Sequence, residues 1–507
     1  MVKGIRSSRW GAVGLPWWAA GLLAIASGAI GLALARLPAL TALIGLTVAI
    51  LLVLTLVEPL VGLGVTLIFA TFKPLTDYFV PQLPLDIGQI ALIVTLGSWL
   101  LRALRRREIQ IPPSPITIPL LVWIGAACLS ILGALSLGYA VKELIKWLQI
   151  LAVMWLVILE GRSGRWRTVL GMVIGAALLE SLIGIWQFGI RGDGPKTFLI
   201  LGDKFYRAYG TFEQPNPFGG FIGLTLPLVL GLLLGALAVW LGAARQRWAQ
   251  NRAQSRIDWP AVIVNPDIWR VVLLGLLALI LLAALIMSWS RGAWLGFGAV
   301  IAVLLIAWPR RAWIGALLVG LAVVVVVVGG HYNLLPSAIS ARLTDFTEFT
   351  QTFDVHGVDI TADNYAVLER LAHWQAAEEM ARYYPWTGVG IGNYEPVYPA
   401  FRLMNWPYPL GHAHDIYLNV LAETGIIGLL AYAALWITIF FWTWRITRSV
   451  DIWRRSVAVG LLGTWTHLSV HNLVDNLYVA NIHLHLAALL GILTCLILIE
   501  KEAKRKS

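Results

Sequence analysis

Cysteine and charged residues are both scarce in this chain of 507 residues. The two cysteines, Cys128 and Cys495, each lie inside an apolar run, so we expect neither a disulfide framework nor a metal site with cysteine spacing. Only 13% of the residues are charged, whereas 59% are hydrophobic and the mean hydropathy is +0.77. A soluble protein of this length cannot hide so much apolar surface, and the composition therefore predicts an integral membrane protein.

Other features are missing as well. The sequence has no internal repeat, and its first apolar run lacks a small-residue cleavage site, so we expect no cleavable signal peptide. A Gly-x-Gly-x-Gly segment at 388–392 does not stand between a strand and a helix, which makes it weak evidence for nucleotide binding. The net charge of +11 comes mostly from short loops between apolar runs. It indicates membrane orientation and not nucleic-acid binding.

Long apolar runs predict an all-α polytopic membrane protein with about 12–14 transmembrane helices. The predicted spans are 14–35, 39–57, 88–104, 115–136, 142–160, 167–189, 217–243, 270–288, 293–309, 312–330, 416–444, 455–473 and 481–499. A shorter run at 59–73 is either a further span or a re-entrant segment.

Seven clusters of Lys and Arg fall on one side of the membrane when these spans are counted. They lie at 3–6, 102–107, 162–167, 245–256, 310–311, 445–455 and 501–506. The positive-inside rule makes that side cytoplasmic and puts both termini there. The opposite side then receives 190–216, the corner at 288–292, 331–415 and the turn at 474–481. The segment 331–415 has no Lys, as expected of an outward-facing loop.

The chain accordingly divides into three parts. Residues 1–330 form transmembrane helices with an outer loop at 190–216, residues 331–415 form one large extracytoplasmic loop, and residues 416–507 form the C-terminal transmembrane helices and a basic cytoplasmic tail. The large loop is too long for a connector, so we expect it to be functional. It contains a predicted helix near 364–384, with Asp363 and Asn364 as possible N-caps. That helix either lies on the membrane or covers the site as a lid.

Four outward-facing segments concentrate polar residues beside the spans. They are 206–220, 288–293, 369–374 and 412–415. In the last segment His414 is the candidate general base, because imidazole titrates near neutral pH and can take a proton from a hydroxyl. His412 is the alternative base, or it shapes the turn. Asp415 either orients a histidine or caps the following helix.

Two outward arginines run against the orientation bias. Arg291 stands between Ser290 and Gly292 at the start of a helix, where a guanidinium and free backbone N–H groups together suit a phosphate oxygen. Arg207 offers a second cation of the same kind. The alternatives are that Arg291 is an interfacial anchor and that Arg207 is a solvated loop charge.

Polar residues also occur within or at the end of spans. Glu180 lies inside a span, and a buried acid in lipid is costly and usually functional, by lining a cavity or by coupling to an ion. Asp475 follows another span together with His471, Asn472 and Asn476. This group either lines the same cavity or, as we favour, forms a hydrogen-bond network between helices.

Together these residues resemble the O-antigen ligase family, membrane glycosyltransferases whose relatives include O-antigen polymerases and protein O-oligosaccharyltransferases. The resemblance is carried by Arg207 with 210–219, by Ser-x-Ser-Arg-Gly at 288–292, by Arg…Trp…Pro-x-x-Gly-x-Gly at 370–390, by His…Tyr-Leu…Glu-x-Gly-x-x-Gly at 414–428 and, more weakly, by 471–475. It covers the chain from near residue 200 to near residue 480. The family usually has Asn after the histidine; Asp415 at that position would change the pH dependence without abolishing function.

The resemblance implies a glycosyltransferase C-like fold and transfer of a glycan from an undecaprenyl-diphosphate-linked donor to an acceptor hydroxyl on the outer face of the plasma membrane. His414 would activate the acceptor, while Arg207 and Arg291 would hold the diphosphate and stabilise its developing charge. Further candidates for substrate contact are Arg370, His412, Asp415, Asn216, Tyr417, Asp475 and Glu180. The sequence contains no Asp-x-Asp pair, so we expect metal-independent transfer without a cofactor. The expected partners are the lipid-linked donor, a lipid or glycan acceptor and membrane lipids.

Two alternatives remain open. Polymerase-type chain extension differs from ligation only in its acceptor, and no residue names the acceptor. A bicarbonate or solute transporter would instead show discontinuous helices, inverted repeats and paired intramembrane charges. Among these features the sequence offers only Glu180.

Overall fold

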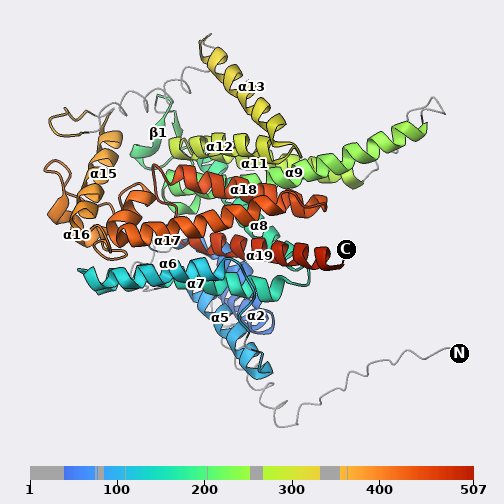
Figure 1. Cartoon of the computed structure of the whole chain (residues 1–507), viewed down its shortest axis with the longest axis horizontal. Helices are drawn as coiled ribbons and strands as arrows, with labels where there is room; N and C mark the ends of the chain where they lie inside the picture. The colour runs from blue at the N-terminus through green and yellow to red at the C-terminus, as the bar shows by residue number, and fades with distance from the viewer. Residues whose placement is uncertain are drawn as a thin grey trace.

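The computed structural model describes residues 39–74, 77, 85–108, 110–202, 204–251, 266–331, 354–361 and 364–506, and these residues are almost entirely helical (Figure 1). The helices are α2 (Ala39–Val57), α3 (Pro59–Ala70), α5 (Ile87–Arg106), α6 (Thr117–Ser130), α7 (Leu137–Gly161), α8 (Trp166–Trp186), α9 (Pro215–Asn251), α11 (Pro266–Met287), α12 (Arg291–Ala307), α13 (Ala312–His331), α15 (Tyr365–Tyr383), α16 (Tyr394–Phe401), α17 (Ile416–Ile446), α18 (Ile452–His471) and α19 (Ile482–Lys506). The predicted span at 14–35 and the cap at Asp363 lie outside the described residues.

The all-helical, polytopic class predicted from the sequence is confirmed. In the described part of the chain, seven helices are long and apolar enough to cross a membrane, and five further apolar helices are shorter. The run at 59–73 forms one of these shorter helices, α3. The loop helix begins after Asn364, as predicted, and ends at Tyr383, just before Pro385.

Three local features were not predicted. The eight-residue α16 follows the Gly-rich segment of the large loop. The end of α8 widens into a π-helical turn at Gln187–Arg191. Two strands of two residues each, β1 (Leu199–Ile200) and β2 (Phe205–Tyr206), pair antiparallel just before Arg207. Each of these segments is too short for hydrophobic periodicity to reveal it.

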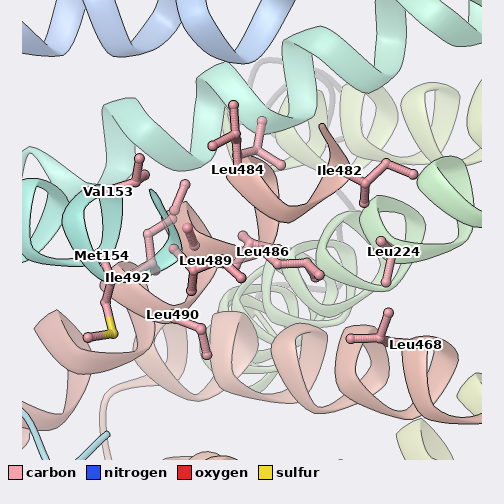
Figure 2. Packing of buried hydrophobic residues seen from close by; sticks show 14 of the residues in the cluster. Val153, Met154, Leu224, Leu468, Ile482, Leu484, Leu486, Leu489, Leu490 and Ile492 are labelled. Atoms are coloured by element: carbon pink, nitrogen blue, oxygen red, sulfur yellow. The ribbon is translucent and has the colours of Figure 1, made fainter. Parts of the chain in front are cut away.

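Helix α19 lies at the centre of the bundle. Its residues from Ile482 to Ile497 are buried, and apart from His483, His485 and Thr494 they are apolar on every face of the helix. Figure 2 shows Leu484 to Ile492 of α19 among Val153 and Met154 of α7, Leu224 of α9 and Leu468 of α18. Because lipid is as apolar as these side chains, close packing and not hydrophobic burial holds such helices together.

Small residues bring α9 and α18 into contact. A Cβ on Gly460 would lie 2.7 Å from the Cα of Leu228, and a Cβ on Gly231 would lie 2.4 Å from the carbonyl oxygen of Ser456. Backbones this close leave no room for larger residues, as in other helix pairs within membranes. The tight α9–α18 pair fixes the end of α18, from which the polar turn at 472–481 extends.

The large loop docks onto a break in α17. Helices α15 and α16 lie at one end of the bundle, opposite the C terminus (Figure 1). Gly425 has φ 63° inside α17, and at this break the backbone N–H of Ile426 donates to the carbonyl of Pro385 at 2.8 Å. A Cβ on Gly425 would lie 2.3 Å from the carbonyl carbon of Trp386. The glycines of the 385–392 and 423–428 motifs therefore anchor the loop onto the membrane bundle.

Candidate active site

The four polar segments predicted from the sequence meet near the junction of α15, α17 and α18. Trp374 on α15 donates its indole N–H to the carbonyl oxygen of His414 at 3.4 Å. Asp475, in the turn after α18, places Oδ1 3.7 Å from Nδ1 of His414. Gly292, at the start of α12, packs so closely on His471 that a Cβ there would lie 2.8 Å from the imidazole Cδ2. Segments from 288 to 475 thus form one connected polar cluster.

His414 is held in an unusual conformation at the end of the large loop. Its φ is +56°, a left-handed value that costs a non-glycine residue about 1–3 kcal/mol and that clusters at functional sites. Its backbone N–H donates to Nδ1 of His412 at 3.1 Å. Neither of its own ring nitrogens hydrogen-bonds within the described part of the chain, although both are buried. The surrounding structure therefore fixes the backbone and leaves the imidazole ready for a ligand.

Asp475 is the carboxylate that faces this imidazole. Asp475 is 7% exposed, and burial alone would raise the pKa of its carboxyl group. The contact with His414, followed by electrostatic interactions with His471, His412 and Arg370, outweighs burial and holds the pKa of Asp475 below its usual range. Its Oδ2 also lies 4.0 Å from Nε2 of His471. An ionised carboxylate among these groups suits the orientation of an imidazole that accepts a proton.

For His412 and Asp415, the structure favours one of the two roles that the sequence left open. Burial, followed by repulsion from His414, lowers the pKa of His412 to about 3, so this histidine is neutral near pH 7 and a weak base. The Asp415 carboxylate accepts from the N–H groups of Tyr417 at 2.7 Å and Leu418 at 3.0 Å. It therefore caps α17, and burial raises its pKa to about 6 despite these two bonds.

Arg207 and Arg291 share the corner between α11 and α12. Arg207 donates from Nε to the carbonyl of Ser288 at 2.9 Å and from Nη2 to Oδ1 of Asn216 at 3.0 Å. Arg291 begins α12, whose N-cap Ser290 accepts from the N–H of Ala293 at 3.4 Å. The candidate Asn216 thus orients a guanidinium group. Two cations and a helix N-terminus at one corner suit an anionic ligand.

Arg370 brings a third guanidinium toward the same cluster. Its Nη1 donates to the carbonyl of Ala366 at 3.0 Å, while its Nε is buried without a hydrogen-bond partner among the described residues. Its charge acts on both Asp475 and His471. The cluster therefore receives cations from α15 as well as from the α11–α12 corner.

Glu180 and Tyr417 have structural contacts. Glu180 is fully buried, and its carboxylate accepts from Oγ1 of Thr211 at 2.6 Å and from the Thr211 N–H at 3.0 Å. It thereby fixes the turn at 210–212 that follows Arg207. Tyr417 donates its hydroxyl to the carbonyl of Ser469 at 3.0 Å, which ties α17 to α18. The described residues place no second acid beside Glu180 that would form a paired intramembrane site.

One histidine was not predicted from the sequence. His373 lies on the face of α15 that also carries Arg370 and Trp374, and its ring centroid is 5.8 Å from that of His414. Its Nδ1 lies 2.8 Å from the hydroxyl of Tyr394, and burial, followed by His414, lowers its pKa to about 4. Its spacing of three residues from Arg370 was the signal that places it on the same face of the helix.

A metal ion is a possible ligand of this cluster. The donor atoms of His412, His414 and Asp475 lie within 4.8 Å of one another, and two imidazoles with one carboxylate are a donor set that suits zinc. However, Nδ1 of His412 already accepts the backbone N–H of His414. Metal binding through Nδ1 of His412 would break that bond, and binding through Nε2 would move the ring proton to Nδ1 and break it as well.

Comparison with known families finds a match over part of the chain. Residues 276–433 match the family model of the O-antigen ligases. The O-antigen ligase match contains Arg291, Arg370 and His414, whereas Arg207 and Asp475 lie outside the matched segment. No curated protein matches the chain. The match shows that this segment is similar to O-antigen ligases.

Proposed function

We propose that the protein transfers a glycan from an undecaprenyl-diphosphate-linked donor to an acceptor hydroxyl, with His414 as the general base. The observation that carries the proposal is the imidazole of His414, whose two buried nitrogens have no hydrogen-bond partner in the described structure and whose Nδ1 lies 3.7 Å from the Asp475 carboxylate. The O-antigen ligase match supports the reaction class. Ligation to a lipid acceptor is the proposed reaction, and polymerase-type chain extension is the alternative.

The reaction is a single displacement at the anomeric carbon of the donor glycan. The acceptor oxygen forms a bond to that carbon while the bond from the carbon to the diphosphate oxygen breaks. The acceptor proton passes to Nε2 of His414, because Nδ1 faces Asp475. The diphosphate leaves with the electron pair, and Arg207, Arg291 and Arg370 stabilise its charge. Loss of one such preorganised donor typically costs on the order of 100- to 1000-fold in rate.

The site is proposed to face the extracytoplasmic side. Support comes from contacts that bring basic segments together. Arg102 donates to the carbonyl of Val57 at 3.0 Å and Arg165 lies 2.6 Å from the neighbouring Glu58. Arg448 donates to the carbonyl of Arg310 at 3.2 Å. A side rich in Lys and Arg is normally cytoplasmic, and both termini are proposed to lie there.

Transfer is proposed to need no metal, because three guanidinium groups provide the positive charge that a divalent cation would otherwise supply. A chelator should leave the rate unchanged. Added Zn²⁺ should inhibit, because binding to His414 and Asp475 would block the base. Loss of activity with the chelator, followed by recovery with Mg²⁺ or Mn²⁺, would refute metal independence while leaving glycosyl transfer intact.

The test of function is a reconstituted transfer assay. Purified protein in proteoliposomes would receive a fluorescent undecaprenyl-diphosphate glycan and a panel of lipid-core, lipid-linked and peptide acceptors. We expect product with one acceptor class, which separates ligase from polymerase. His414→Ala should abolish product, whereas His412→Ala, which removes the acceptor of the His414 N–H but keeps the base, should lower product formation without abolishing it. Absence of transfer with every acceptor, together with bicarbonate flux, would favour the transporter instead.

A further inference from the structure

A polar cavity adjoins the candidate base. It has a volume of about 360 Å³ and lies between α6, α7, α16 and α17, next to the turn after α18. His412 forms part of its wall, and the ring centroid of His412 is 4.4 Å from that of His414. This volume falls at the lower end of the range of about 300–1000 Å³ for small-molecule sites. A ligand in the cavity would therefore sit one side chain away from the base.

The arginines approach His414 through different neighbours. Arg291 is next to Gly292, which packs on His471, and His471 contacts Asp475. Arg207, Arg291 and Arg370 do not line the cavity. Through these neighbours His414 adjoins two separate environments, one with guanidinium groups and one without. A transfer reaction needs two such environments, one for a diphosphate donor and one for an acceptor.

The walls of the cavity combine aromatic rings with polar side chains. Trp147 packs against Trp123 and Tyr478, with ring centroids 5.1 Å and 5.2 Å apart, and Tyr139 and Asn419 also line the space. A sugar ring has an apolar face of C–H groups and an edge of hydroxyls. Aromatic surface with a few placed polar groups is the combination that binds such a ligand.

The charges of the cavity argue against an anionic ligand. Its walls carry two lysines, Lys142 and Lys146, which the acids Glu143 and Glu395 balance even without the buried Glu423, so the cavity has no net positive charge. Lys146 is already paired with Glu143 at 2.6 Å. Within the described residues, no hydrogen bond or ion pair engages the Glu395 carboxylate. This carboxylate lies near Gly411, the residue before His412: its Oε2 would be 3.9 Å from a Cβ added to Gly411. A free carboxylate here repels phosphate and accepts hydrogen bonds from hydroxyl or ammonium groups.

We propose that this cavity is the acceptor subsite, and that it binds a terminal sugar that carries neither phosphate nor carboxylate, such as a neutral hexose or a hexosamine. The inference rests on the proposed function. Glu395 binds a hydroxyl or amino group of the acceptor sugar, Tyr139 contacts its ring, and the nucleophilic hydroxyl points past His412 toward His414.

Kinetics of pocket variants test the assignment. Glu395→Gln and Tyr139→Ala should each raise the acceptor KM, by about 10- to 100-fold for Glu395→Gln, as expected when a hydrogen bond to a charged group is weakened. The donor KM should change by less than about twofold. Matched controls are Glu378→Gln and Tyr383→Ala, whose side chains are exposed on α15; both should behave like wild type. An unchanged acceptor KM in both pocket variants, or a preference for phosphorylated acceptors, would overturn the proposal.

A binding measurement separates failure of the subsite from failure of the proposed function. A glycolipid with a diazirine on its terminal neutral sugar would be photo-crosslinked to the wild-type protein, and the labelled peptides would be mapped. Labelling of 139–147 or 410–412, reduced by excess unlabelled glycolipid, supports the subsite even if no transfer is detected. Competed labelling confined to other segments contradicts the subsite even if transfer is efficient.

Discussion

Replacement of Asp475 by Asn removes a negative charge but keeps the shape of the side chain. The carboxylate Oδ1 lies 3.7 Å from Nδ1 of His414, a distance at which two unit charges interact by about 4 kcal/mol at an effective dielectric constant of about 20. If this attraction develops as His414 takes the proton, its loss corresponds to about a 1000-fold lower kcat. Because Oδ1 also accepts from the N–H of Asn476 at 2.9 Å, Asn can retain that bond and the fold.

The assay for Asp475→Asn is steady-state transfer with both substrates varied. We expect kcat to fall by about 100- to 1000-fold, with donor and acceptor KM values near wild type, because Asp475 positions the base and does not hold a substrate. Asp475→Glu should recover part of the loss. Asp451→Asn, at the N-cap of the same helix α18, is the matched control. A variant that raises KM and leaves kcat intact would refute the positioning role.

Three further predictions concern stability and the intramembrane acid. Gly425→Ala should lower the free energy of unfolding by about 1–3 kcal/mol or more, because φ is 63° and the neighbouring backbone leaves no room for a Cβ. Gly298→Ala is the control, because open space surrounds Gly298, and it should not lower stability. Equal melting temperatures for the two variants would contradict the docking role of Gly425. Glu180→Gln should retain transfer, because an amide can still bond to the buried turn; complete loss of activity in a folded variant would indicate a catalytic or ion-coupling role. The pKa values of His373 and His412, about 4 and about 3, lie below the unfolded value near 6.5. The unfolded state therefore binds more protons, and stability should fall as the pH drops from about 6.5 toward 4. A melting temperature in detergent that is constant over this pH range would refute this prediction.

The membrane helices were predicted well because a long apolar run is stable in few settings besides the interior of a bilayer. The sequence also placed the polar segments near 207, 291, 370 and 414 on one side, and the structure brings them into contact. Short elements such as α16 and the β1–β2 pair escaped prediction because they span too few residues to show a period. The length of a hydrophobic pattern therefore explains both why the membrane helices could be predicted and why α16 and the β1–β2 pair could not.

The partners of individual side chains were harder to predict. The sequence offered Asp415 as the neighbour of His414, but Asp415 caps α17 and the more distant Asp475 faces the imidazole. Such pairing depends on how α17 and α18 pack, which no local pattern encodes. Similarly, Gly388 and Gly425 have the sequence context of turn residues, whereas the close approach of each to the other's segment requires the folded loop.

The proposed mechanism assigns the chemistry to His414 and the binding of the donor diphosphate to the arginines. The experiment that separates these two roles measures donor affinity and single-turnover transfer side by side for wild type, His414→Ala and Arg291→Ala in proteoliposomes. We predict that His414→Ala binds the undecaprenyl-diphosphate glycan like wild type but transfers at least about 100-fold more slowly, and that Arg291→Ala loses donor affinity. Wild-type transfer rates in a folded His414→Ala variant would contradict the mechanism.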